Sequence, residues 1–572
     1  MIFLKKLESV LSKYIQTFQI AKIRKKNYFF VIFLTLLTVI LDAAGISILL
    51  PIGEYVLSYE TGKVPDTYAW KLLKDIFLYL NLKPDILLIV GFAVIVIFLR
   101  QIVVFTRAII IDIIRFKAVK DFREKLFVKF LRQDLYYIKQ YSTGIYNNVI
   151  NLEVDNVGKA IVLPLENVSG IILIVSYLSL MMFISIQATL IVMAFMILTG
   201  LLLKNILYYI KRTANNIIKI NNKFSQNLVD RLIAIKLIRV SNKINKEEEQ
   251  NKEILSDQFI NNVKLSRIQR IIDSAIEPML LMVAIPVIII AIKLNFPLAQ
   301  LGVFIILLAR FIPVFRVTVI SIQGHFSYYA SISNMLKLID KVDSQKEMRT
   351  GSLDAPKYFK SIKFNNIYFN YDKSEKNILN NFSCEVKGGK VNVLIGTSGS
   401  GKTTIVNMIP RLLDPNKGKI LINDINLNKI NVDKIRDVCA YIEQKPTFIR
   451  GTILEHISYN KGKVKRKNAE EAAKLANAHN FIMNLEKNYD HLLGESGVGL
   501  SGGQLQRLDI TRGLASEKPL MILDEPTSNL DKKNTKDLLL TLRKINKIKN
   551  TTIIIVSHDT SILKYCDNII KI

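Results

Sequence analysis

Six long apolar runs dominate the first part of the chain, and each is close to the length that a helix needs to cross a lipid bilayer. They cover residues 29–57, 86–111, 161–184, 188–203, 275–292 and 298–322. Only a few residues separate the third run from the fourth and the fifth from the sixth, so we expect these pairs to be helical hairpins. Long polar segments join the second run to the third and the fourth to the fifth. The pattern predicts an α-helical membrane domain of about six transmembrane helices over residues 1–339.

Composition and charge agree with a membrane protein. Half of the 572 residues are hydrophobic, which is too apolar for an ordinary soluble enzyme. The formal net charge of +30 is explained by basic residues that face anionic lipid headgroups, and no nucleic-acid-binding module is visible. Residues 204–273 hold fourteen Lys or Arg against seven Asp or Glu, whereas residues 58–85 hold four of each. Because basic residues mark cytoplasmic loops, we expect the long loops, the N-terminus and everything after residue 339 to be cytoplasmic.

A glycine-rich loop follows a polar linker that we place at residues 340–356. The apolar run Val391–Ile395 is typical of a buried strand, residues 404–412 predict a helix, and the loop lies between them. In such a loop, backbone N–H groups wrap phosphates, Lys402 supplies positive charge and Thr403 offers a hydroxyl to Mg²⁺. Residues 357–572 are therefore predicted to form an α/β P-loop NTPase domain. The phosphate-binding residues are Gly396, Thr397, Ser398, Gly399, Ser400, Gly401, Lys402, Thr403 and Thr404.

Two carboxylates end a second short apolar run, at residues 520–523. Asp524 is suited to bind magnesium, and Glu525 is suited to polarise the water that attacks the γ-phosphate. A purely structural pair is the weaker alternative, because buried carboxylates without partners are costly. A third run, residues 551–556, ends close to His558. These residues predict a hydrolytic site beside the glycine-rich loop.

The segment LSGGQ, at residues 500–504, lies between the glycine-rich loop and the paired carboxylates. In this order the motifs resemble the nucleotide-binding domain of ATP-binding cassette (ABC) transporters over residues 357–572. The resemblance implies that the nucleotide is ATP, and that Ser501, Gly502, Gly503 and Gln504 contact ATP bound to the opposing subunit. One membrane domain and one cassette would then be half of a transporter. The expected working unit is a homodimer.

Further roles follow from the same resemblance, one residue at a time. Gln444 is similar to the glutamine that senses both magnesium and the membrane domain. His558 is similar to the switch histidine that contacts the γ-phosphate, although a lone histidine is more often structural. Tyr371 resembles the aromatic residue that stacks on adenine, although by itself it would more often belong to a core. Asp531 resembles the residue that couples the two ATP sites.

Several arginines fall within or beside the apolar runs, where a charge is expensive and indicates a function by default. A stripe of arginines facing the bundle interior would suit a phosphate or pyrophosphate group, because guanidinium groups bind phosphate oxygens in a fork. The alternative is that they pair with Asp42, Glu166, Asp273 or Glu277, or reach a membrane surface. The candidates for a substrate path are Arg100, Arg107, Arg270, Arg310 and Arg316.

A short amphipathic helix is predicted between the first two runs, with Trp70, Leu73, Phe77 and Leu80 on one face. On the outer surface it would lie at the lipid interface. Together with the arginines, this helix resembles the PglK-type flippases of polyprenyl-pyrophosphate-linked oligosaccharides. In that family the helix meets the polyprenyl tail and pore arginines meet the pyrophosphate.

The favoured function is therefore ATP-driven flipping or export across a bacterial inner membrane, with a lipid-linked oligosaccharide as substrate. An ABC exporter of peptides, drugs or other lipids is the main alternative. An ATP-gated channel or regulator is a third, but the intact Lys402, Ser501 and Glu525 argue against it, because gating needs no complete hydrolytic site. We also expect residues 144–149 and 227–234 to form short helices that couple the cassette to the membrane domain.

Overall fold

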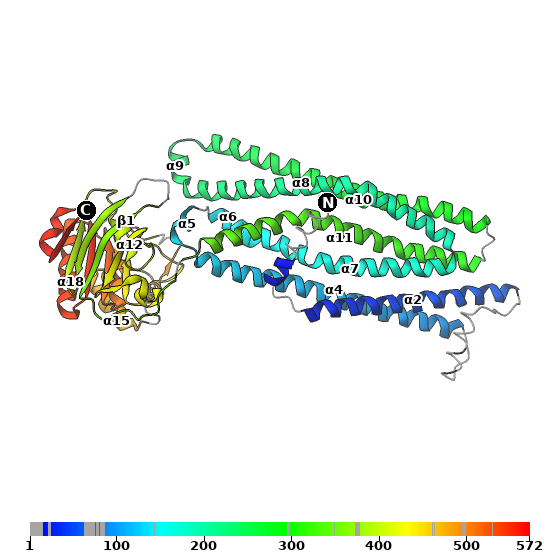
Figure 1. The fold of residues 1–572 in the computed structure, drawn as a ribbon, viewed down its shortest axis with the longest axis horizontal. Helices are drawn as coiled ribbons and strands as arrows, with labels where there is room; N and C mark the ends of the chain where they lie inside the picture. Colours follow the sequence, from blue (N-terminus) through cyan, green and yellow to red (C-terminus); the bar gives the residue numbers. More distant parts are fainter. Residues whose placement is uncertain are drawn as a thin grey trace. The chain divides into compact units, whose positions relative to one another are not determined.

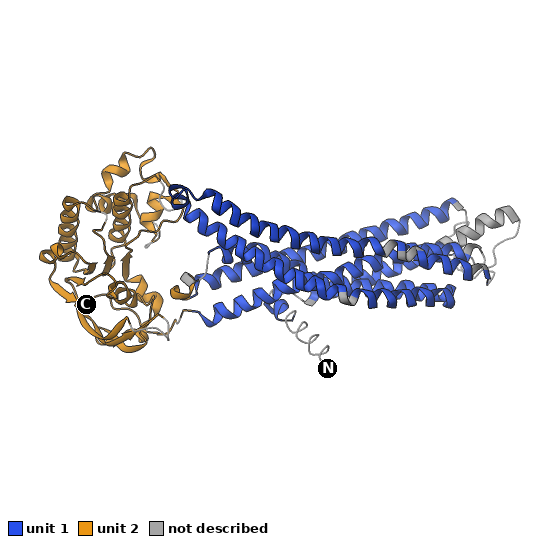
Figure 2. Cartoon of the chain, turned by 90° about the horizontal axis from the view of Figure 1, so that it is seen from above, with its two compact units in different colours: residues 1–133, 139–346 blue, residues 134–138, 347–572 orange. Residues whose placement is uncertain are grey.

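The computed structural model places the chain in two compact units, which Figure 2 shows in different colours. Unit 1 consists of residues 1–133 and 139–346, and unit 2 of residues 134–138 and 347–572. The structure describes the chain except at residues 1–14, 21–24, 62–74, 76–78, 80–85, 141–142, 294–297, 348, 372–377, 460–461, 463, 495–498 and 529.

Unit 1 is a bundle of long helices (Figure 1). Its main helices are α2 (Lys25–Thr61), α4 (Ile86–Leu131), α7 (Val154–Ile184), α8 (Ile186–Ile233), α10 (Ile244–Lys293) and α11 (Leu298–Ser344). Short elements join them, namely α6 (Thr143–Asn148), a π-helix at Val149–Glu153 and α9 (Ile235–Val240). Within the described ranges, five helical stretches are long and apolar enough to cross a membrane. The fifth predicted run, 275–292, falls in α10, which is not one of these five stretches.

Helices α7 and α11 pack against each other at very close range. A Cβ atom added to Gly170 on α7 would lie 2.2 Å from Oγ1 of Thr318 on α11. A Cβ atom added to Gly324 on α11 would lie 3.1 Å from a methyl carbon of Leu163 on α7. Since real Cβ atoms do not approach other atoms to 2.2 Å, a side chain at position 170 would require Thr318 or the helices themselves to shift.

Unit 2 contains a five-stranded sheet in the order β11-β3-β10-β9-β6. Its strands are β3 (Val391–Ile395), β6 (Cys439–Ile442), β9 (Leu520–Asp524), β10 (Thr552–Ser557) and β11 (Asn568–Lys571), all paired in parallel. Every residue of β9 and β10 is buried, as expected for strands covered on both faces, which explains their continuous apolar runs. The carboxyl ends of parallel strands meet at one edge of the sheet, and the predicted site residues follow β3, β9 and β10 there.

A second sheet in unit 2 is antiparallel, in the order β2-β1-β4-β5. It contains β1 (Ser361–Phe369), β2 (Leu379–Lys387), β4 (Lys417–Ile422) and β5 (Ile425–Asn426), while β7 (Gly451–Thr452) pairs with β8 (Leu492–Leu493). The helices are α12 (Lys402–Met408), α13 (Val432–Asp437), α14 (Ile453–Ser458), α15 (Arg466–Leu475), α16 (His479–Met483), α17 (Gly502–Ala515) and α18 (Lys532–Lys549). In the part of unit 2 that the structure describes, 3₁₀ turns lie at Leu427–Lys429, Asn488–Asp490 and Thr560–Tyr565.

The structure differs from the sequence-based expectations in several places. Residues 340–344 of the predicted linker belong to α11, which ends at Ser344. The expected short helix at 227–234 is instead the end of the long helix α8, whereas 144–149 does fall in the short α6 and the start of the π-helix. Helix α5 (Leu135–Gln140) was not expected. The amphipathic stretch with Trp70, Leu73, Phe77 and Leu80 lies outside the described residues.

Candidate functional site

The glycine-rich loop turns from β3 into α12, as its sequence predicts. Gly399 and Gly401 have φ angles of +82° and +93°, which side chains other than hydrogen rarely tolerate. The ammonium group of Lys402 lies inside the turn and donates hydrogen bonds to the carbonyl oxygens of Gly396 (2.9 Å) and Thr397 (2.7 Å). The loop therefore curls around the cation that is expected to face a phosphate.

Asp524, the last residue of β9, lies beside this loop. It is 3% exposed, and its Oδ1 is buried without a hydrogen-bond partner among the described residues. Burial raises the pKa of its carboxyl group; a hydrogen bond with the Thr403 side chain opposes the rise, and the nearby Glu525 carboxylate adds to it. An unpartnered buried oxygen next to a hydroxyl fits the oxygen-preferring ligand set of Mg²⁺. Asp524 and Thr403 are therefore the residues that could hold this ion.

Glu525 lies at the centre of a three-residue cluster. Gln444, which follows β6, donates a hydrogen bond from Nε2 to Oε2 of Glu525 at 2.7 Å. Nδ1 of His558, which follows β10, lies 3.4 Å from Oε1 of the same carboxylate. Glu525 has a φ of +46°, so a left-handed backbone residue aims this carboxylate. The fold thus brings together Gln444, Glu525 and His558, three of the residues predicted for the ATP site.

The signature segment begins helix α17. Ser501 is its N-cap: Oγ of Ser501 accepts a hydrogen bond from the Gln504 backbone N–H (3.3 Å), and Oε1 of Gln504 accepts one from the Ser501 N–H (2.8 Å). Since Ser501 uses its oxygen as an acceptor, its hydroxyl proton remains available to a ligand. Asp531 is the N-cap of α18 and accepts a hydrogen bond from the Asn534 N–H at 2.7 Å. Its carboxylate therefore has a structural contact as well as its expected role.

Tyr371 has contacts on its ring and on its hydroxyl. Its Oη lies 3.1 Å from Oγ1 of Thr404 in the phosphate loop, and Phe369 meets its ring edge-on. The ring of Tyr136 stacks on it, with centroids 5.5 Å apart and planes 23° from parallel. Tyr136 belongs to the short segment 134–138, which is part of unit 2. The sequence analysis missed this residue, although the pair Tyr136-Tyr137, which begins two residues after Asp134, was a signal.

Two buried residues of α17 were also missed. Nε2 of Gln506 donates to the carbonyl oxygen of Glu525 at 3.3 Å, which connects the signature helix to the catalytic strand end. Oδ1 of Asp509 accepts a hydrogen bond from Nε of Arg512 at 2.6 Å and lies 3.5 Å from Nε2 of His456. Burial works against the charge of Asp509, but His456 and Arg512 together hold its pKa below the usual range. Both side chains follow the LSGGQ segment at helical spacing, which is a usable signal in retrospect.

Comparison with known protein families identifies the two parts of the chain. The family described as ABC transporter matches residues 379–528. The family described as ABC transporter transmembrane region matches residues 28–319, just over half of the chain. The chain belongs to the ABC transporter family. This confirms the predicted resemblance and the predicted fold class, a helical membrane domain followed by an α/β ATP-binding domain.

Individual ABC transporters resemble this chain over part or all of its length. The ATP-dependent lipid A-core flippase of Pasteurella multocida (strain Pm70) is 36% identical over 244 residues, which are 42% of this chain and 41% of the relative. ABC transporter B family member 6 of Arabidopsis thaliana is 33% identical over 241 residues, which are 42% of this chain and 17% of the relative. The chain thus matches less than half the length of these curated relatives.

A solved structure of a bacterial Atm1-family ABC exporter with ATP bound has the same fold. It superimposes with a TM-score of 0.75 at 20% identity, over 96% of this chain and 94% of that chain.

The membrane unit of this ABC transporter holds an ionic cluster around the buried Asp42. Asp42 on α2 is 5% exposed; its Oδ1 lies 2.6 Å from Nε of Arg100 on α4 and 3.5 Å from Nη1 of Arg310 on α11. Its Oδ2 accepts a hydrogen bond from the hydroxyl of Tyr177 on α7 at 2.9 Å. The ion-pair alternative is thus confirmed for two of the candidate arginines. Two guanidinium groups share one carboxylate, which leaves donors and one positive charge in excess.

The other three candidate arginines lie elsewhere in unit 1. Arg107, seven residues after Arg100 on α4, has a buried Nη1 without a hydrogen-bond partner among the described residues. Arg316 is half-buried on α11. Arg270 on α10 lines a cavity between α7, α10 and α11. Of the five predicted arginines, Arg100 and Arg310 thus pair with Asp42, and Arg270 lines a separate cavity.

Proposed function

We propose that this ABC transporter is half of a homodimer that uses ATP hydrolysis to flip or export a lipid-borne substrate across a bacterial inner membrane. The cluster of Gln444, Glu525 and His558 next to the phosphate loop is the observation that carries the ATPase part. A channel or regulator needs to bind ATP, but it does not need a carboxylate, an amide and an imidazole assembled around one position. This arrangement favours hydrolysis over gating alone.

Each residue of the cluster has a chemical task in this proposal. The Glu525 carboxylate polarises the attacking water, and Gln444 holds that carboxylate in place through the hydrogen bond to Oε2. His558 lies at the other carboxylate oxygen, and its proposed task is to contact the γ-phosphate. Mg²⁺, held by Asp524 and Thr403, would neutralise charge on the phosphates. Ser501 would offer its hydroxyl proton to ATP bound to the second subunit.

The favoured substrate is a polyprenyl-pyrophosphate-linked oligosaccharide. Support comes from the excess positive charge at Asp42, Arg100 and Arg310, because a pyrophosphate can accept the donors that one carboxylate leaves free. The second candidate is another lipid with an anionic head group. The lipid A-core flippase of Pasteurella multocida, one of the two relatives named above, favours this alternative over peptide or drug export.

The test is a pair of measurements on the same proteoliposomes, flipping of the lipid-linked oligosaccharide and ATP hydrolysis. Replacing Arg100 or Arg310 by Ala removes a charge-assisted contact worth about 1.5–3 kcal/mol, so flipping is expected to fall by roughly tenfold or more while basal hydrolysis persists. Arg239→Ala, at an exposed position of α9, is the matched control.

A solely structural role for the ion pairs gives another result. Asp42→Asn and the two arginine variants would then lower expression, hydrolysis and flipping together, because each leaves buried charge uncompensated. Unchanged flipping in both arginine variants, or no flipping by the wild-type protein, would refute the pyrophosphate assignment.

A further inference from the structure

A polar cavity of about 390 Å³ lies in unit 1 between α7, α10 and α11. Its volume is within the range of sites that bind small molecules or parts of larger ones. Hydroxyl, amide and charged side chains contribute much of its wall, among them Gln269, Ser321, Gln323 and Ser327. None of the roles described above uses these four residues.

Two polar atoms in the wall of this cavity lack partners. Oε1 of Gln323, a residue that is 3% exposed, and Oγ of Ser327 are both buried without a hydrogen-bond partner within the described structure. Buried polar atoms are almost always hydrogen-bonded, because leaving one unpaired costs free energy. Two such atoms on successive turns of α11, facing one cavity, are therefore a preformed place for the hydrogen-bonding groups of a ligand.

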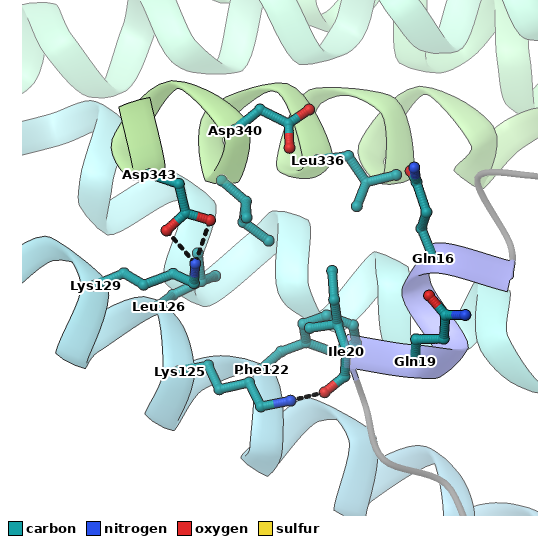
Figure 3. A pocket seen from close by; sticks show the side chains of 11 residues that line it. Gln16, Gln19, Ile20, Phe122, Lys125, Leu126, Lys129, Leu336, Asp340 and Asp343 are labelled. Atoms are coloured by element: carbon teal, nitrogen blue, oxygen red, sulfur yellow. Dashed lines mark hydrogen bonds and ion pairs between the residues drawn. The ribbon is translucent and has the colours of Figure 1, made fainter. Parts of the chain in front are cut away.

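A second hollow in unit 1 provides the contrast. Figure 3 shows this pocket, of about 420 Å³, between the short helix at residues 15–20, α4 and α11. Its cations are engaged: Lys129 pairs with Asp343, and Lys125 donates to the carbonyl oxygen of Ile20. The described residues that line it contribute none of the unpartnered buried polar atoms. The contact of Lys125 with Ile20 thus holds the helix at residues 15–20 against the bundle. The α7–α10–α11 cavity differs because its wall contains polar atoms that lack hydrogen-bond partners within the described structure.

The charges of the α7–α10–α11 cavity indicate which ligand fits. Glu166 and Asp273 are acidic and Arg270 is basic, so the formal charge of the wall is negative. One carboxylate oxygen of Glu166 already accepts a hydrogen bond from Ser321 at 3.3 Å. A negative wall repels a phosphate, while amides, hydroxyls and carboxylates together bind uncharged groups that carry many hydroxyls.

We propose that this cavity binds the saccharide part of the transported lipid, an assignment that rests on the proposed function. The phosphate-binding arginines and the cavity are then two separate subsites. Arg310 and Gln323 are thirteen residues apart on α11, which at the rise of an α-helix is about 20 Å. An oligosaccharide linked through a pyrophosphate carries its charge at one end and its hydroxyl groups along its length. The two subsites match this arrangement.

The experiment compares three lipids in proteoliposomes that contain the full-length protein: a polyprenyl pyrophosphate with its oligosaccharide, the same lipid without sugar, and a lipid A-core glycolipid. Gln323→Leu removes the amide at nearly constant volume. We expect it to lower flipping of the sugar-bearing polyprenyl lipid by roughly two- to tenfold, as for one neutral hydrogen bond, and to spare the sugar-free lipid. Gln300→Leu, at an exposed position of the same helix, is the control.

The midpoint of thermal unfolding is the control for correct folding of each variant. Gln323→Leu removes an unpartnered buried oxygen, so its midpoint should equal or exceed that of the wild type. If this variant does not fold, Ser327→Ala replaces it with the same expectation for flipping. The glycolipid identifies the source of the sugar: a Gln323-dependent loss with both sugar-bearing lipids assigns the cavity to glycan hydroxyls in general, and a loss with one assigns it to that lipid.

Two results overturn the proposal in distinguishable ways. Equal effects of Gln323→Leu on glycosylated and sugar-free lipid, or no effect on either, would show that the cavity does not bind sugar, while the arginine variants would still test the proposed function. Failure of the wild-type protein to flip any sugar-bearing lipid would remove the proposed function, and with it this inference.

Discussion

Replacement of Glu525 by Gln is the sharpest test of the ATP site. The side chain keeps its size. In the wild-type protein, Gln444 Nε2 donates a hydrogen bond to Oε2 of Glu525 at 2.7 Å, and the amide of the variant can be oriented so that its oxygen still accepts this bond. What is lost is the negative charge that polarises water. General-base catalysis contributes about 10²–10⁴-fold, which corresponds to about 2.7–5.4 kcal/mol of barrier. We expect ATP turnover to fall by that factor and ATP affinity to remain within about threefold.

The assay combines phosphate release by purified protein in lipid nanodiscs with equilibrium binding of a fluorescent ATP analogue. Glu471→Gln, the same substitution at an exposed position of α15, is the matched control and should leave both quantities unchanged. Gln444→Ala removes the group that positions the carboxylate, and it should lower ATP turnover less than Glu525→Gln does. The double variant should turn over ATP little more slowly than Glu525→Gln alone, because both residues act on one step. Near-wild-type hydrolysis by Glu525→Gln would refute the role assigned to this carboxylate.

Three further predictions concern other parts of the ATP-binding domain. Mixing Lys402→Ala chains with Ser501→Arg chains should restore ATP binding at one site of the mixed dimer. Each variant carries its own affinity tag, and the amount of radiolabelled ATP retained by doubly tagged dimers measures this binding. If the mixed dimers recover no ATP binding, the site is not shared between subunits. Tyr136→Ala should strengthen ATP binding by roughly two- to tenfold, because it frees one face of the Tyr371 ring from an aromatic contact worth about 0.5–1.5 kcal/mol. Weaker ATP binding by this variant would mean that Tyr136 itself holds adenine. Asp509→Asn should lower the free energy of unfolding at neutral pH by about 3 kcal/mol. Since the pKa of Asp509 is depressed in the folded protein, its contribution is present above the ordinary aspartate pKa and is lost as the pH falls through the folded value. The difference from wild type should therefore shrink in acid, and a difference independent of pH would refute the ionic explanation.

The sequence predicted the parts of the structure that depend on local pattern. The apolar runs that became β3 and β10 are buried on both faces and therefore contain almost no polar residue, which makes them easy to recognise. Gly399 and Gly401 could be predicted because a positive φ restricts the residue type. The cluster around Glu525 followed from strand ends that meet at one edge of a parallel sheet, once the family resemblance had named its members.

Other features depend on contacts between distant segments and had no comparable signal. The pairing of Asp42 with Arg100 and Arg310 joins three helices, and sequence alone left ion pairing and substrate binding equally open. The stacking of Tyr136 on Tyr371 involves a six-residue helix that is too short to show a periodic pattern. Gln323 follows directly on an apolar run, and only the packing of α7, α10 and α11 reveals that its oxygen is buried beside a cavity.

The close packing of α7 on α11 limits how the membrane unit can move. With Gly170 against Thr318 and Gly324 against Leu163, these two helices have no space in which to slide past each other without breaking contact at both points. Two of the three walls of the α7–α10–α11 cavity belong to this closely packed pair. The third wall is α10, whose internal prolines, Pro278 and Pro286, interrupt its hydrogen-bond ladder. A displacement of α10 away from α7 and α11 would therefore widen the cavity and leave the contacts between α7 and α11 in place.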